Sequence, residues 1–154
     1  MSEEFYLNSL YPLQDKVLKI IEGVSTLFYL TWGTALSRGY LNHRFSDDID
    51  LFMNNSETFK ESVSAIIRDL SLNFPGNVEI GISDTTFYRI IVKENKTVLK
   101  CDFVNDSTCH YGDTESASFF SKIDNPYNIL SNKISALPRS EPKDVADILF
   151  LSYK

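Results

Sequence analysis

The sequence has few cysteines and no long apolar run. Cys101 and Cys109 are its two cysteines; they lack the CxxC spacing of a zinc site, and two thiols do not make a disulfide framework. No run of about 18 apolar residues occurs, and the N-terminal MSEEFYLNSLYPL lacks the basic region and apolar stretch of a signal peptide. We therefore expect a cytoplasmic protein that is neither exported nor membrane-spanning.

Basic residues are also scarce. Against 21 Asp and Glu the chain has 15 Lys and Arg, a formal net charge of -6. No overall basic field attracts phosphate backbones, so any nucleic-acid partner must be held locally. With 154 residues, 43% of them hydrophobic, the chain is long enough to bury one core, and we expect a single domain over residues 1–154.

Apolar periodicity predicts the elements of this domain. Amphipathic spacing indicates helices from Ser9 to Gly23, after Ser56 up to about Leu70, from Pro126 to Ala136, and from Ser140 onward, with a short helix capped by Thr34. Continuous or alternating apolar stretches predict strands at 26–32, 49–53, 78–83, 87–92 and 97–104, and residues 105–118 read as a polar loop. The expected fold is α+β, one mixed sheet of about five strands with helices packed on one face.

Two aspartates lie where a predicted strand begins. Asp48 and Asp50 are two residues apart, so on a strand both carboxylates project from one face and repel each other. A bound divalent cation such as Mg²⁺ or Mn²⁺ reverses that repulsion and leaves positions open for phosphate oxygens. A solvated acidic turn is the alternative.

Upstream, Gly33 and Thr34 lie where a predicted strand becomes a helix. Free N–H groups at a helix start bind phosphate, and glycine permits close approach. A phosphate cradle here and a cation site at the next strand suit one metal-bound triphosphate. Asp102 is the candidate third carboxylate for a two-metal site; alternatively it pairs with Lys100 or Arg89.

The run YLTWGTALSRGYLNHRFSDDIDLF resembles the nucleotidyltransferase superfamily of DNA polymerase β, and within it the AbiEii toxin family. A second segment, NKISALPRSEPKDVADI, resembles the family's helical segment, and Asp102 falls between the two. The matching positions are Gly33, Thr34, Ala35, Leu36, His43, Arg44, Ser46, Asp48, Asp50, Lys133, Arg139, Lys143, Asp144 and Asp147.

The resemblance implies metal-dependent transfer of a nucleoside monophosphate from an NTP to an acceptor such as tRNA or protein, by the toxin of a toxin–antitoxin pair. It implies that Asp48, Asp50 and Asp102 hold the metals and that Lys133 neutralises phosphate charge. The implied nucleotide-binding residues are Gly33, Thr34, Arg44, Ser46 and Asp147.

Some residues keep two interpretations. Arg44 contacts the nucleotide or pairs with Asp47 and the neighbouring aspartates, and Lys143 with Asp147 could form an ion pair along one helix. Trp32 stands where the family usually has its first glycine; it points into the core, stacks on a base, or marks a chain without catalysis. A nucleotide- or partner-binding module and a transferase acting on small antibiotic-like molecules are therefore the alternative functions.

Overall fold

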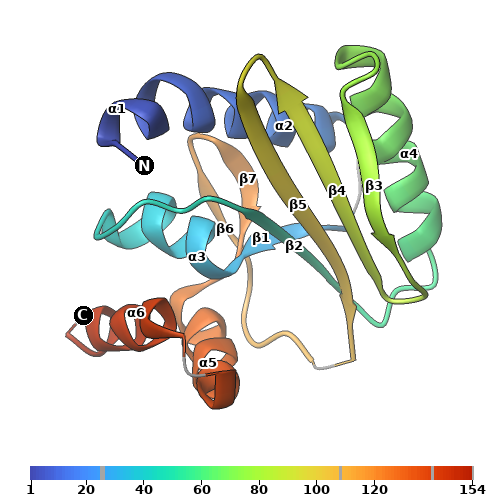
Figure 1. Cartoon of the computed structure of the whole chain (residues 1–154). Coiled ribbons are helices and arrows are strands. Elements are labelled where there is room, and N and C mark those ends of the chain that lie inside the picture. The colour runs from blue at the N-terminus through green and yellow to red at the C-terminus, as the bar shows by residue number, and fades with distance from the viewer. Residues whose placement is uncertain (25–26, 108, 140, 154) are drawn as a thin grey trace.

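The computed structural model describes residues 1–24, 27–107, 109–139 and 141–153, and it is an α+β fold built on one mixed sheet (Figure 1). The helices are α1 (Glu3–Phe5), η1 (Tyr6–Leu10), α2 (Tyr11–Gly23), α3 (Trp32–Thr34), η2 (Ala35–Leu41), α4 (Phe59–Asn73), α5 (Pro126–Ala136), η3 (Leu137–Arg139) and α6 (Pro142–Ser152). The strands are β1 (Tyr29–Thr31), β2 (Ile49–Asn54), β3 (Val78–Ser83), β4 (Phe87–Glu94), β5 (Thr97–Asp106), β6 (Glu115–Ala117) and β7 (Phe120–Ile123).

The sheet runs in the order β3-β4-β5-β2-β1-β7-β6. Strand β2 pairs in parallel with β5 and antiparallel with β1, while β4 joins β5 in an antiparallel hairpin. All five predicted strands are present. The structure adds β6 and β7, which local patterning does not reveal because each is three or four residues long, and β7 joins the sheet through a parallel pair with the distant β1.

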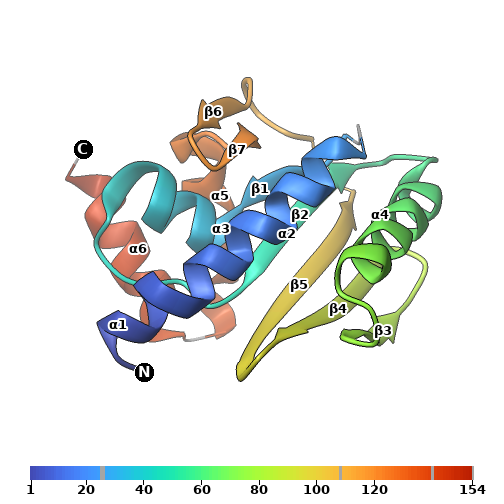
Figure 2. The ribbon, with the colours of Figure 1, turned by 90° about the horizontal axis from the view of Figure 1, so that it is seen from above.

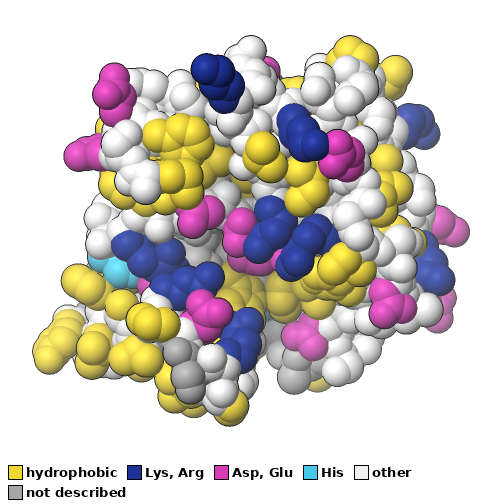
Figure 3. Space-filling model, in the orientation of Figure 1, with side chains coloured by type: hydrophobic (Ala, Val, Ile, Leu, Met, Phe, Trp, Pro, Cys, Tyr) yellow, Lys and Arg dark blue, Asp and Glu magenta, His cyan; other side chains and the backbone are white. Residues whose placement is uncertain are grey.

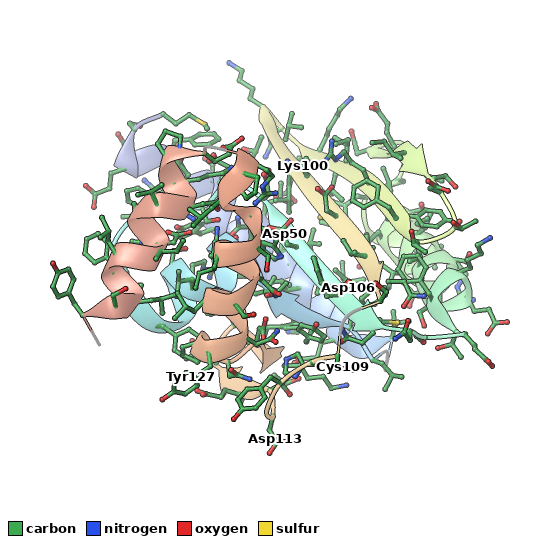
Figure 4. The ribbon with its side chains drawn as sticks, turned by 90° about the horizontal axis from the view of Figure 1, so that it is seen from below. Asp50, Lys100, Asp106, Cys109, Asp113 and Tyr127 are labelled. Carbon is green, nitrogen blue, oxygen red and sulfur yellow. The ribbon has the colours of Figure 1, made fainter. Side chains whose placement is uncertain are left out.

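Helices cover both faces of the sheet, which corrects the expectation of one covered face. Viewed from above, α2 and α4 lie in front of the strands (Figure 2). Viewed from below, α5 lies in front, next to β1 and β2, while α6 lies on the far side of α5 from the strands and β4 and β5 are left open (Figure 4). The apolar core lies under α2 and α4, where Leu13, Val17, Val63 and Ile66 are completely buried.

Most predicted helix ends agree with the structure, with two corrections around the first strand and helix. The first helix begins at Glu3 rather than Ser9, because the π-helical turn η1 carries the helix up to Pro12. Trp32 starts α3 instead of ending a strand, so Thr31 is the N-cap residue and Thr34 is not. The predicted starts at residue 26 and Ser140 lie outside the described residues.

In the described part of the chain, we find no helix with the length and apolar character needed to span a membrane. Within the same part, Cys101 is a buried free thiol and Cys109 an exposed one.

Candidate functional site

The parallel pairing of β2 with β5 brings the predicted carboxylates together. Asp50 lies directly opposite Asp102, and the preceding pair, Ile49 and Cys101, is buried on the other face of the sheet. Because side chains alternate along a strand, Asp48, Asp50 and Asp102 face the same side. This is the side that α5 partly covers, and Figure 4 shows Asp50 beside that helix.

Asp50 is the centre of this group. Burial is the largest cause that raises its pKa, to about 7, and the charges of Asp102 and Asp48 add to the effect. No ion pair of Asp50 is present among the residues described. An uncompensated carboxylate in this setting favours either a proton or a bound cation.

The other two carboxylates have cationic partners. Lys100 Nζ lies 2.7 Å from Asp48 Oδ2. The Arg89 guanidinium donates two hydrogen bonds to Asp102, Nε to Oδ1 at 2.8 Å and Nη2 to Oδ2 at 2.7 Å. Of the two partners that the sequence offered for Asp102, the structure therefore selects Arg89.

At the turn from β1 to α3, side chains pack closely against the backbone and leave no open loop. At Gly33 a Cβ atom would meet Arg44 Nη2 at 2.8 Å and Ser46 Oγ at 3.0 Å, so only glycine fits without displacement. The Thr34 hydroxyl donates to the Asp48 carbonyl and is hydrogen-bonded to the Ser46 hydroxyl at 2.8 Å. Thr34 and Ser46 are buried, and they fix the backbone that carries Asp48.

Trp32 does not point into the apolar core, which removes that interpretation. Its backbone has φ of 58°, a left-handed conformation that explains why glycine suits this position in the family pattern. The indole lines the cleft, with its ring centroid 4.9 Å from Lys133 Nζ and 4.5 Å from Arg139 Cζ. Its buried Nε1 has no hydrogen-bond partner within the described residues.

Asp147 is fully buried and joins three segments. Arg44 donates two hydrogen bonds to it, both 2.7 Å long, His43 Nε2 lies at 2.7 Å and Lys133 Nζ at 2.8 Å. Burial alone would raise the pKa of Asp147, but the hydrogen bonds and charges of Arg44 and Lys133 lower it to about 2. Asp147 thus orients the Arg44 and Lys133 side chains from a position behind the wall of the site.

Two ion pairs that the sequence offered as alternative interpretations are replaced by others in the structure. Arg44 pairs with Asp147 rather than with Asp47, whose carboxylate accepts a hydrogen bond from Tyr6 Oη at 2.6 Å. Lys143 lies 3.6 Å from Glu141 and not against Asp147, because Asp147 is on the buried face of α6. Spacing along one helix or loop does not reveal these partners, since Arg44 approaches α6 from a distant segment.

Lys133 is held away from solvent. Its Nζ lies 2.6 Å from Asp144 and 2.8 Å from Asp147, and its side chain is 2% exposed. Arg139, half-exposed, pairs with the other oxygen of Asp144 at 3.0 Å. The cations of the cleft that are at least partly exposed are Arg44, Arg89, Lys100, Arg139 and Lys143, whereas Lys133 is buried.

Most of the predicted site residues line one cleft. It is lined by seven of the nine predicted residues, while Thr34 and Asp147 lie behind its wall. Figure 3 shows its surface as Lys and Arg side chains gathered with Asp and Glu over the middle of the molecule. The seven are Gly33, Arg44, Ser46, Asp48, Asp50, Asp102 and Lys133.

The donor chemistry of the cleft fits a hard divalent cation. Three carboxylates on one sheet face offer the oxygen ligands that Mg²⁺ prefers, and Asp50 carries uncompensated charge. Among the described residues, however, no three acidic, histidine or cysteine side chains are arranged to hold a metal as they stand. Asp48 and Asp102 are instead turned toward Lys100 and Arg89.

Sequence reasoning assigned no role in the site to several lining residues. Arg89 was identifiable as the partner of Asp102, since the KENK turn pairs Glu94 with Thr97 and counting back along the hairpin reaches Arg89 opposite Asp102. Asp144 matched the family's helical segment but was given no role in the site, because its contact with Lys133 joins the two helices α5 and α6 and local spacing does not reveal it.

Comparison with known proteins identifies the family of the chain. A family model described as "Nucleotidyl transferase AbiEii toxin, Type IV TA system" matches residues 22–152. No curated protein matches. The crystal structure of JHP933 from Helicobacter pylori is similar with a TM-score of 0.73 and 22% identity, over 99% of this chain and 68% of that one.

A second crystal structure, described as a "putative nucleotidyltransferase from H. pylori", matches with a TM-score of 0.55 and 21% identity, over 87% of this chain and 59% of the other. At these identities the two structures show a shared fold. The family model covers most of the chain, including the turn at Gly33, the three carboxylates and the α5–α6 pair. The chain belongs to the AbiEii nucleotidyltransferase family of type IV toxin–antitoxin systems.

Proposed function

We propose that the protein is a metal-dependent nucleotidyltransferase that transfers NMP from an NTP to a hydroxylated acceptor, tRNA or protein, as the toxin of a pair with an antitoxin. The observation that supports this most is the convergence of Asp48, Asp50 and Asp102 with the tight turn at Gly33 in one cation-rimmed cleft.

In this proposal Asp48 and Asp50 bind Mg²⁺ or Mn²⁺, and Asp102 completes the site beside them. The metal supplies the charge that stabilises the attacking and leaving oxygens. The chain's own groups divide the remaining work. Asp102 accepts the proton of the attacking hydroxyl, while the accessible cations Arg89, Lys100 and Arg139 are placed to bind phosphate oxygens.

In this proposal Gly33 and Arg44 form the part of the cleft that binds the nucleotide phosphates. The Arg44 guanidinium lies against the Gly33 backbone and is itself oriented by Asp147. A bidentate guanidinium held by a buried carboxylate is a preorganised donor, so little ordering is needed when phosphate binds. Arg44 and Asp147 therefore act together, with Arg44 the residue nearer the nucleotide.

The test is transfer of α-labelled NMP to total RNA, tRNA or cell protein in the presence of Mg²⁺. We expect label transfer by the wild type and a loss of at least about 100-fold with Asp48→Asn, Asp50→Asn or Asp102→Asn, in line with the weight of metal ligands in such reactions. Asp47→Asn is the matched control, because Asp47 is adjacent in sequence but is hydrogen-bonded to Tyr6.

A protein that binds NTP but transfers no label to any acceptor would instead be a binding module. One observation favours this second candidate: Trp32 stands beside Gly33 and narrows the cleft between Lys133 and Arg139. A thermal shift with NTP and Mg²⁺ in a protein that transfers no label would identify the binding module, since a ligand at 100 times its Kd stabilises a protein by about 2.7 kcal/mol without any turnover.

A further inference from the structure

Two cations occupy the carboxylates that the proposed function assigns to the metal. Strands β2 and β5 form a grid on one sheet face, in which Asp48 lies beside Lys100 and Asp50 lies opposite Asp102. Strand β4 adds Arg89 directly opposite Asp102. The register of β4 and β5 therefore builds the Arg89–Asp102 ion pair, and the residue directly before β2 forms the pair with Lys100.

These ion pairs take up the oxygens that a metal would need. Arg89 occupies both oxygens of Asp102, and Lys100 occupies Oδ2 of Asp48. A divalent cation bound by several carboxylates contacts such oxygens at about 2.1 Å, so Lys100 and Arg89 compete with it for them. Asp50 is the one carboxylate of the three for which the described residues provide no ion pair, although the charges of Lys100 and Lys133 act on it.

Both cations are free to move outward. The side chains of Lys100 and Arg89 are about one third exposed, whereas Asp102 is largely buried. Both line the same cleft as the tight turn at Gly33, so phosphate oxygens bound there would lie within reach of their long side chains. The buried Lys133, held by two carboxylates, lacks this freedom.

We propose that Lys100 and Arg89 are exchangeable counter-ions: they neutralise Asp48 and Asp102 in the metal-free protein and transfer to the nucleotide phosphates when a divalent cation takes the carboxylates. This inference rests on the proposed function, because it needs metal and nucleotide in this cleft. It predicts two effects of opposite sign. Each of the side chains Lys100 and Arg89 weakens the binding of metal alone, and each strengthens the binding of metal together with nucleotide.

The test measures Mn²⁺ binding to the full chain by electron paramagnetic resonance, without nucleotide. Lys100→Gln and Arg89→Gln are expected to bind Mn²⁺ about five- to thirtyfold more tightly than the wild type, as expected for removing a charge-assisted competitor. With ATP present, the same variants are expected to bind the Mn²⁺-nucleotide about tenfold more weakly. Circular dichroism confirms that each variant is folded.

Two controls separate displacement from a general change in charge. Lys143→Gln removes a cation that lines the same cleft but lies nearest Glu141, and Lys93→Gln removes one on β4 that pairs with Glu79. Both are expected to leave Mn²⁺ affinity within about twofold of the wild type, because neither touches the metal carboxylates. Equal tightening in Lys143→Gln would overturn the inference.

NMR signals of the arginine side chains provide a second measurement. On Mg²⁺ addition the NMR signal of the Arg89 Nε–H group is expected to shift, while that of Arg38, which pairs with Asp15, stays in place. Unchanged or weaker Mn²⁺ binding by both variants overturns the inference and leaves the proposed function standing. Absence of metal binding in every variant, with and without ATP, overturns both.

Discussion

At the scale of the residue, Trp32 combines a left-handed backbone conformation with a bulky side chain beside the site. Its φ of 58° brings Cβ close to the following carbonyl, which costs residues with a side chain about 1–2 kcal/mol. The indole recovers part of this through cation–π contacts with Lys133 and Arg139. Strain retained beside a functional cleft suggests that the side chain is used there.

Glycine and alanine at position 32 separate strain from side-chain contacts. Both Trp32→Gly and Trp32→Ala remove the indole, but only glycine adopts a positive φ without penalty. We expect Trp32→Gly to be about 1 kcal/mol more stable than Trp32→Ala in urea unfolding. Equal stability, or a more stable alanine variant, would show that the backbone at this position is not strained.

Asp50 makes the stability of the metal-free protein depend on pH. Its folded-state pKa is about 7 against an ordinary value of 3.8, so between these values the folded state holds a proton that the unfolded state has lost. The contribution of this proton to stability is therefore lost as pH rises through this window. A metal on Asp50 would remove the penalty.

The corresponding variant is Asp50→Asn, measured by urea unfolding with a chelator present. Relative to the wild type, we expect it to gain about 1–3 kcal/mol between pH 5 and pH 8, since one pKa unit corresponds to about 1.4 kcal/mol. Asp113→Asn, in an exposed loop, controls for loss of a negative charge. A constant difference between Asp50→Asn and wild type across this pH range would contradict the assignment.

At the scale of the element, helix α6 is attached to the rest of the site through charge. Asp147 and Asp144 point inward and bind cations from α5 and from the segment before β2, while Val145 and Leu149 remain exposed on the opposite side of the helix. Buried ion pairs of this kind give little net stability but are costly to break singly. They set the position of α6 relative to the cleft.

Asp147→Asn is expected to destabilise the protein by about 3–5 kcal/mol, because it leaves Arg44 and Lys133 with reduced compensation in a buried setting. Lys143→Ala, on the same helix in an exposed pair 3.6 Å from Glu141, is expected to stay within about 0.5 kcal/mol of the wild type. Chemical denaturation measures both. A loss below about 1 kcal/mol for Asp147→Asn would show that α6 is held by apolar packing instead.

Local sequence signals predicted the elements well and their long-range partners less well. The alternation around Asp48 and Asp50 and the hairpin turn at KENK predicted strands that the structure contains. Strand β7 depends on β1, far away in sequence, and the pairing of Arg44 with Asp147 joins segments 103 residues apart. No local pattern encodes such contacts, which arise from the packing of the whole chain.

At the scale of the whole molecule, charge is unevenly distributed. The chain has 15 Lys and Arg and a net charge of -6, yet six of those cations line a single cleft, where they meet six carboxylates. These local cations can bind a phosphate-bearing ligand although the protein as a whole is acidic. This agrees with the expectation from composition that such a ligand must be held locally. The six cations are Arg44, Arg89, Lys100, Lys133, Arg139 and Lys143.

The fold class was accessible from the spacing and order of the predicted strands. The grouping of Asp102 with Asp48 and Asp50 was predicted from the two-metal requirement and the family resemblance, because no strand order that pairs β2 with β5 had been predicted. The position of α5 on the second sheet face was not predicted, since an amphipathic helix pattern does not say which face of a sheet it covers. That placement makes the open β4–β5 surface and the covered β1–β2 surface into two walls of one cleft.

The most direct test of the central claim is a crystal of the protein soaked with Mn²⁺ and a non-hydrolysable NTP, measured for anomalous scattering from manganese. Our account predicts a manganese peak between Asp48 and Asp50, in reach of Asp102, with Lys100 and Arg89 moved onto the phosphates. Nucleotide bound with manganese elsewhere, while both ion pairs stay intact, would contradict it.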